Sequence, residues 1–247
     1  MLTEVLLKSF LTVISALLGA GVLFFIKLNH KKLCALISFS AGALFGAAAF
    51  TLIPESYENL SIVELLIGVV SGYLLFWFIS KYYAHVCPAC AASHFDEQTT
   101  KRFSEIVLTL LTALSIHSFM DGVAISTGNL HGHHESVFAA ILTHKFPEGL
   151  ALAALMFSSN YAKGKIIIYV FLVEMVTVLG AISGLLLFNE GISTVLMGIV
   201  MAHVAGGFIY LAIHAVLGEM VRHHKGLVIG SFAAGILIIL SVFLFIG

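Results

Sequence analysis

The sequence predicts an all-α integral membrane protein with eight transmembrane helices, and three observations lead to this fold class. Of its 247 residues, 60% are hydrophobic and only 10% are charged, with a mean hydropathy of +1.08. A soluble domain would carry about 25% charged residues. Apolar stretches of about 20 residues, the length that crosses a bilayer, recur along the whole chain. The basic residues, finally, gather in every second loop between these stretches.

The apolar stretches leave no room for a soluble domain, so residues 1–247 are expected to form a single transmembrane domain. The first stretch is not followed by a cleavage site of small residues and is expected to remain as a span rather than to be removed as a signal peptide. The longest loop comprises residues 81–105. The spans are expected at Val5–Ile26, Leu33–Ile53, Ile62–Ser80, Ile106–Gly128, Ser136–Ser158, Ile166–Phe188, Ile192–Leu217 and Gly226–Ile246.

The basic residues predict the orientation of the chain. The first, third, fifth and seventh loops carry ten of the twelve Lys and Arg residues, and the other three loops carry none. Cytoplasmic loops are enriched in Lys and Arg, so the odd-numbered loops are expected in the cytoplasm and both termini outside it. The short loops favour a bacterial inner membrane. The net charge of −1 argues against nucleic acid as a partner.

Small residues repeat along the second span at Ser38, Gly42, Gly46 and Ala49. Such stripes let helices approach closely in a membrane. Packing within the chain is the favoured interpretation, and a homodimer contact is the alternative.

Two neighbouring spans carry the same polar pattern. His117 and Asp121 in the fourth span, and His144 and Glu148 in the fifth, are four residues apart, so each pair lies on one face of its helix. Ionisable groups inside a membrane are costly and usually functional. Together the two pairs offer four ligands to one divalent cation. Imidazole and carboxylate suit zinc, iron, manganese or cadmium, and the pattern does not rank these metals.

Other residues near this pattern have their own expected roles. Lys145, one turn inside the fifth span, is expected to pair with a nearby acid. Pro147 cannot donate a helical hydrogen bond and is expected to bend the helix. Gly122 and Gly149 follow the two carboxylates and permit close helix approach. Glu174 in the sixth span is expected on the ion pathway, with an interhelical hydrogen bond as the alternative.

Further polar groups lie toward the two ends of the spans. Candidates for an outer entrance are Glu55, where Pro54 is expected to end the second span, and His131, His133 and His134 in the fourth loop. Candidates for cytoplasmic metal contacts are His85, Cys87, Cys90 and His94 within residues 81–105, and His214 in the seventh span. Two thiols and two imidazoles can bind zinc or copper. The alternatives are an unstructured loop for the Cys and His cluster, a solvated turn for the fourth loop and simple packing for His214.

At the paired motifs the sequence resembles the ZIP (Zrt-, Irt-like protein) family of divalent metal importers. The resemblance rests on HSFMDGVAI from His117, HKFPEGLAL from His144 and GGFIYLAIHAVLGEM from Gly206. The eight spans, outside termini and histidine-bearing third loop agree with it. It implies an alternating-access cycle in which the metal-bearing helices move against a scaffold. It also implies a primary metal site at His117, Asp121, His144 and Glu148, with Glu174 helping to form it.

The sequence departs from some of these relatives at two positions. Relatives that hold two neighbouring metals have Asn and Asp where this chain has Ser118 and Lys145. A lysine puts a fixed positive charge where the second metal would sit. We therefore expect a single-metal site in which the Lys145 ammonium takes the place of the second ion.

The expected function is secondary transport of a divalent transition metal, zinc first among them, into the cytoplasm. The metal is the substrate, no prosthetic group is expected, and no nucleotide-binding motif points to ATP as the direct energy source. Two other functions fit part of the pattern. An intramembrane metal-dependent hydrolase could activate water at an open coordination position, although no HExxH motif is present. A metal sensor could report cytoplasmic zinc through residues 81–105 without transport.

Overall fold

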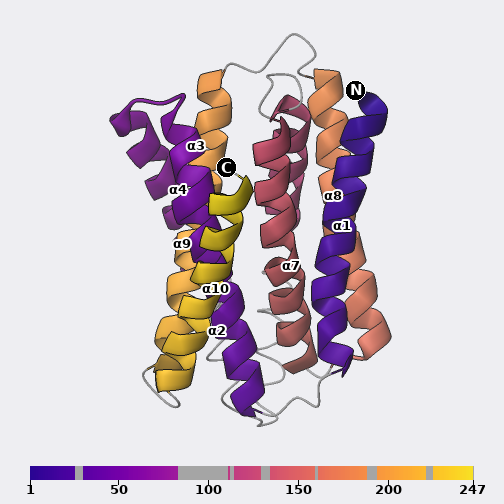
Figure 1. Cartoon of the computed structure of the whole chain (residues 1–247), viewed down its shortest axis with the longest axis vertical. Coiled ribbons are helices and arrows are strands. Elements are labelled where there is room, and N and C mark those ends of the chain that lie inside the picture. Colours follow the sequence, from indigo (N-terminus) through magenta and orange to yellow (C-terminus); the bar gives the residue numbers. More distant parts are fainter. Residues whose placement is uncertain are drawn as a thin grey trace.

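The structure is a computed structural model that describes residues 1–25, 30–82, 111, 114–128, 134–158, 161–187, 194–220 and 225–246. Within these residues all regular structure is helical, as predicted (Figure 1). The long helices are α1 (Leu2–Phe25), α2 (His30–Ala47), α4 (Ile62–Tyr82), α7 (His134–Ser158), α8 (Lys163–Leu187), α9 (Thr194–Met220) and α10 (Lys225–Ile246). Residues 114–128 form a further helix, which contains the first polar pair.

Six helical segments of the described chain are long and apolar enough to cross a membrane. They correspond to the first three and the last three predicted spans, and the protein is therefore a multi-pass membrane protein. Between them lie residues 114–128 and α7, which carry the paired motifs. α7 has 25 residues, contains Pro147 in its interior and begins two residues before the fifth predicted span. The total of eight spans and the outside location of the termini stay predictions.

The second span continues beyond its predicted end. After α2 the chain forms one π-helical segment, η1 (Ala48–Leu52), and then α3 (Ile53–Tyr57) without leaving the helical path. Pro54 lies in the first turn of α3, where a missing N–H is tolerated. The Ile53 N–H donates a hydrogen bond to the Ala48 carbonyl oxygen five residues back, as in a π-helix. This wider turn lets the helix continue into the segment that contains Pro54. The prediction that Pro54 ends this span was wrong, and Glu55 lies within a helix.

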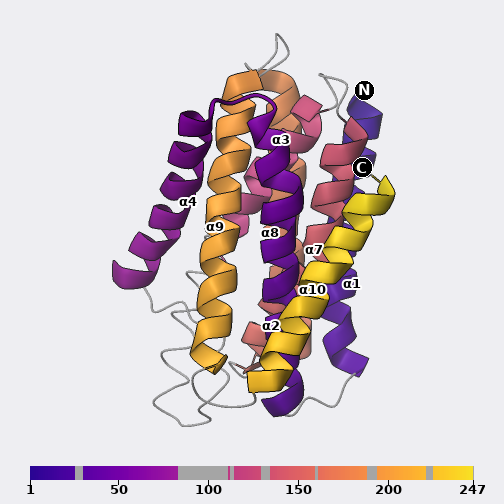
Figure 2. The same ribbon diagram turned by 60° about the vertical axis from the view of Figure 1, so that its left-hand side comes forward.

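The helices are arranged in two groups. α1, residues 114–128, α7 and α8 pack together in one group, which we call the ligand bundle, and α2, α4, α9 and α10 form the other, the support bundle (Figures 1 and 2). α2 also packs against α7 and joins the two bundles.

Close helix pairs inside each bundle meet at reciprocal glycines, where a Cβ would overlap the backbone of the partner helix. The pairs are Gly19 with Gly149, Gly122 with Gly180, Gly42 with Gly235, and Gly72 with Gly206. The first two pairs lie in the ligand bundle and confirm the predicted close approach at Gly122 and Gly149. The third pair accounts for the small-residue stripe of the second span, because Gly42 and Gly46 both pack on α10. That stripe serves packing within the chain and gives no support to a homodimer.

A larger residue at one of these contacts should separate two helices. At Gly72 of α4 a Cβ would overlap the carbonyl oxygen of His203 in α9. Because overpacking a tight contact costs about 1–3 kcal/mol, Gly72→Val should lower the melting temperature in detergent. The matched control is Gly230→Ala in α10, where a Cβ meets nothing within 4 Å. Equal melting temperatures for the two variants would contradict the proposed role of Gly72.

Candidate metal site

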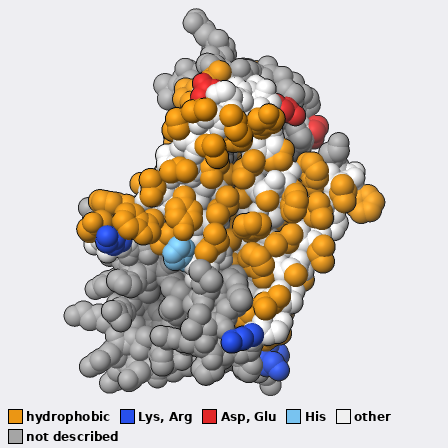
Figure 3. All heavy atoms as spheres, turned by 90° about the vertical axis from the view of Figure 1, so that its left-hand side faces the viewer, with side chains coloured by type: hydrophobic (Ala, Val, Ile, Leu, Met, Phe, Trp, Pro, Cys, Tyr) orange, Lys and Arg blue, Asp and Glu red, His pale blue; other side chains and the backbone are white. Residues whose placement is uncertain are grey.

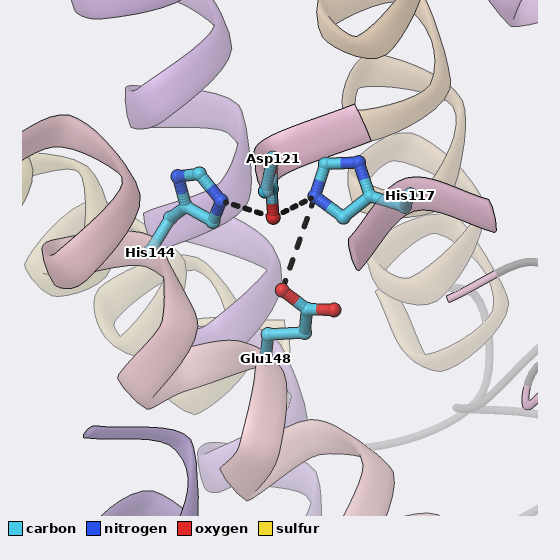
Figure 4. A group of neighbouring side chains, drawn as sticks. All are labelled: His117, Asp121, His144 and Glu148. Carbon is cyan, nitrogen blue, oxygen red and sulfur yellow. Dashed lines mark hydrogen bonds and ion pairs between the residues drawn. The ribbon is translucent and has the colours of Figure 1, made fainter. Parts of the chain in front are cut away.

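The two polar pairs converge on one point between residues 114–128 and α7 (Figure 4). His117, Asp121, His144 and Glu148 each offer a ligand atom, and these atoms all lie within 4.8 Å of one another. The Asp121 Oδ2 atom is 3.2 Å from His117 Nε2 and 3.4 Å from His144 Nε2. His117 Nε2 is also 3.9 Å from Glu148 Oε2. The i,i+4 spacing read from the sequence thus brings all four groups to one point.

This cluster is buried, with residue exposures between 0% and 6%. Zinc–nitrogen bonds of about 2.0–2.1 Å put tetrahedral ligand atoms roughly 3.3 Å apart. The observed spacing therefore needs side-chain shifts on the order of 1 Å to close around such an ion. Glu148 Oε1 and His144 Nδ1 are buried without a hydrogen-bond partner in the described chain. A buried carboxylate oxygen without a partner is costly, and a bound cation offsets that cost.

Lys145 lies beside this cluster and is fully buried. Its Nζ atom is 2.9 Å from Asp121 Oδ2, 3.0 Å from Glu148 Oε2 and 3.0 Å from Glu174 Oε2. It also donates a hydrogen bond of 2.8 Å to the Ser118 hydroxyl. The prediction that Lys145 pairs with an acid is confirmed, but it pairs with three. Three carboxylates and one ammonium leave a formal charge of −2, which a single divalent cation neutralises.

Glu174 of α8 is buried behind this lysine. It forms an ion pair with Lys145, and it is not one of the four residues whose ligand atoms converge. In this structure it holds the ammonium rather than the ion position. Its contribution to metal binding stays a prediction.

Phe208 of α9 closes the site from the support bundle. Its ring centroid is 4.3 Å from that of His117 and 5.1 Å from that of His144, both in edge-to-face geometry. Phe208 is 2% exposed. We did not predict this residue from the sequence, although it lies in the GGFIYLAIHAVLGEM stretch. Through these ring contacts α9 of the support bundle meets the ligand bundle at the site.

Two cavities approach the cluster from different directions. The first, the Glu55 cavity, is lined by Glu55 of α3 and Asp121. The second, the His203 cavity, is lined by His117 and His203. Met120 lines both cavities and lies between the two ligands of its own helix. Of the four convergent residues, Asp121 therefore lines the Glu55 cavity and His117 lines the His203 cavity.

A family model described as "ZIP Zinc transporter" matches residues 89–246, well over half of the chain, including both paired motifs. The chain belongs to the ZIP family. Members of this family are transporters rather than enzymes, so the hydrolase alternative falls away. Membership also implies a divalent metal ion as substrate.

Similarity to individual proteins extends this assignment. This ZIP protein is 28% identical to an uncharacterized protein of Methanocaldococcus jannaschii over 86% of both chains. It is 31% identical to the zinc transporter zipt-7.2 of Caenorhabditis elegans over 52% of this chain and 28% of that one. It is also 31% identical to IAA-alanine resistance protein 1 of Arabidopsis thaliana over 50% of this chain and 27% of that one. The chain thus matches less than a third of the length of these two eukaryotic relatives.

The remaining predicted residues of this ZIP protein lie away from the cluster or outside the described residues. His214 of α9 stacks on Tyr210 at a centroid distance of 3.9 Å, and its Nδ1 atom is 3.0 Å from the Tyr210 carbonyl oxygen. His134 is the first residue of α7. The structure does not describe His85, Cys87, Cys90, His94, His131 and His133.

Proposed function

We propose that this ZIP protein is a secondary transporter that moves a divalent transition metal ion, first of all zinc, into the cytoplasm. The observation that carries the proposal is the convergence of two histidines and two carboxylates within 4.8 Å, buried in a membrane protein. Such a ligand set replaces the hydration shell of a borderline-soft divalent ion. Membership of the ZIP family supports the same function.

The two-bundle architecture supports alternating access. All four convergent residues belong to the ligand bundle, whose helices are held to one another by glycine contacts. Phe208 of the support bundle contacts both histidines. If the ligand bundle shifts against the support bundle, the bound ion loses access to one cavity and gains access to the other. Rigid-body movement of one half of a transporter around a fixed site is a common form of this cycle.

The distribution of charge supports the direction of transport. On the face drawn in Figure 3, acidic side chains gather near the upper end, and Lys side chains lie at mid-height and near the lower end, with hydrophobic side chains over most of the face between the two ends. α3, which contains Glu55, lies toward the upper end of the molecule (Figure 1). By the positive-inside rule the lower end faces the cytoplasm. The Glu55 cavity is then the outer approach. We place the protein in a cell membrane, by our proposal a bacterial inner membrane.

We propose that one ion is carried at a time. The Lys145 ammonium contacts three carboxylates, two of which belong to the convergent cluster. A second divalent ion at that position would meet this ammonium. With Lys145 in place, one divalent ion already balances the buried charge.

Glu55 gives the outer approach an acidic side chain. It is partly buried and shares its cavity with Asp121, so its carboxyl oxygens offer a ligand to a cation on the way to the cluster. Glu55→Gln should raise the KM for external zinc several-fold and change the maximal rate less. Glu58→Gln, in an exposed carboxylate three residues on, is the matched control. A KM for Glu55→Gln equal to that of the control would remove Glu55 from the pathway.

Flux of radiolabelled zinc into proteoliposomes tests the proposed function directly. Zinc should accumulate in vesicles that contain the protein and not in empty vesicles. A protein that binds zinc but gives no flux would act as a sensor instead.

A further inference from the structure

His203 of α9 faces the same cavity as the metal ligand His117 and has no role in the transport site described above. It is partly buried. It lies five residues before Phe208, on the support bundle, whereas His117 lies on the ligand bundle. The His203 cavity therefore joins one imidazole from each bundle.

Ser71 of α4 forms a hydrogen bond with the His203 ring. The Ser71 hydroxyl is 2.8 Å from His203 Nδ1, and it donates its one hydrogen to the Gly68 carbonyl oxygen at 2.7 Å. When the hydroxyl donates to Gly68, it accepts a hydrogen bond from His203 Nδ1–H. In that tautomer the lone pair of the neutral ring is on Nε2. Histidines that bind metals use the same arrangement, with one nitrogen donating to a protein group and the other binding the ion.

The chemistry of the cavity is otherwise apolar. The two imidazoles are its only polar side chains among the described lining residues, and the rest include Leu75, Phe76 and Met120. Met120 contributes a thioether, which is a weak, soft donor. Imidazole and thioether favour soft or borderline transition metals over sodium, magnesium or calcium.

We propose that His203, with His117 and Met120, forms a second binding position for a soft divalent metal ion in the His203 cavity. The ion reaches it from the four-residue cluster while His117 remains a ligand to both positions. Because the new ligand comes from the support bundle, this position holds the ion at the junction between the moving and fixed helices. The inference rests on the proposed transport function and assigns a second position beside the cluster.

Cadmium binding to the purified full-length protein tests the second position without any transport measurement. The parent variant carries Glu148→Gln, which removes a cluster ligand, and Cys87→Ser with Cys90→Ser, which removes the loop thiols. In equilibrium dialysis the parent should retain one cadmium ion per chain. Adding His203→Gln should abolish this binding. Adding Ser71→Ala, which removes only the hydroxyl that orients the ring, should weaken it about tenfold.

Leu75→Ala in the same parent is the matched control, because Leu75 lines the cavity without a ligand atom. It should leave cadmium binding unchanged. Absence of cadmium from the parent, or equal binding with and without His203→Gln, would overturn the proposal.

A measurement of zinc transport distinguishes failure of this inference from failure of the proposed function. In proteoliposomes, His203→Gln in the otherwise natural chain should lower the maximal zinc flux about tenfold with little change in the KM for external zinc. Flux equal to that of the natural chain would overturn the second position and leave the proposed function standing. Absence of flux from the natural chain would overturn the proposed function, and the cadmium result would still decide the binding position.

Discussion

Asp121→Asn should abolish zinc transport while the protein remains folded. Asp121 Oδ2 lies within 3.4 Å of His117, His144 and Lys145, so it is the atom shared by the metal ligands and the buried ammonium. The amide keeps the shape of the side chain but removes the negative charge that a cation needs. Since changes to groups that merely orient metal ligands cost about 10–100-fold, loss of a ligand charge should reduce zinc flux more than about 100-fold.

Flux of radiolabelled zinc into proteoliposomes measures this effect. Glu58→Gln is again the matched control, because it neutralises an exposed carboxylate and should transport like the natural chain. Lys145 keeps Glu148 and Glu174 as partners in Asp121→Asn, so the melting temperature should fall only modestly. Near-normal flux in Asp121→Asn would mean that the ion does not pass through this cluster.

The metal cluster was predictable from the sequence because its geometry is local. A spacing of four residues places two side chains on one face of a helix whatever the rest of the fold does. Two such polar pairs on neighbouring spans are then expected to face one another, since each would otherwise face lipid. The spans themselves followed from hydropathy, since a bilayer requires long apolar helices.

The features that the sequence did not predict depend on contacts between distant segments. Phe208 reaches the two histidines from another bundle, and Met120 lies between cavities whose walls come from several helices. The continuation of the second span through Pro54 was missed for a different reason. Proline often ends a helix, but it is tolerated in a first turn, and a π-helical segment just before it allowed the chain to continue.

Buried charge links the identity of residue 145 to the number of ions carried. The carboxylates of Asp121, Glu148 and Glu174 all contact the one ammonium. Removal of a charged partner from such a buried group is strongly destabilising, by about 3–5 kcal/mol. The lysine is therefore expected to stabilise the metal-free protein as well as to exclude a second ion.

Replacing Lys145 with an acidic ligand should change the count of bound metals from one to two. Lys145→Asp combined with Ser118→Asn leaves four carboxylates with a formal charge of −4 and removes the ammonium from the centre of the group. Two divalent cations neutralise that charge, and carboxylate and amide oxygens supply ligands for the second ion. Metal analysis of purified protein in the Cys87→Ser, Cys90→Ser, His203→Gln background should show one intramembrane zinc when residue 145 is lysine and two for the double variant.

Lys145→Met separates the loss of the ammonium from the gain of a ligand. It removes the positive charge with a side chain of similar length but adds no oxygen. If the count depends on a ligand as well as on charge, this variant should still bind one zinc, and its metal-free form should melt well below the natural chain. Addition of zinc should restore much of the lost stability, because an ion that binds only the folded state shifts unfolding by mass action. In the background that lacks Cys87, Cys90 and His203, two zinc ions with Lys145 in place, or one in the double variant, would show that Lys145 does not set the number of ions.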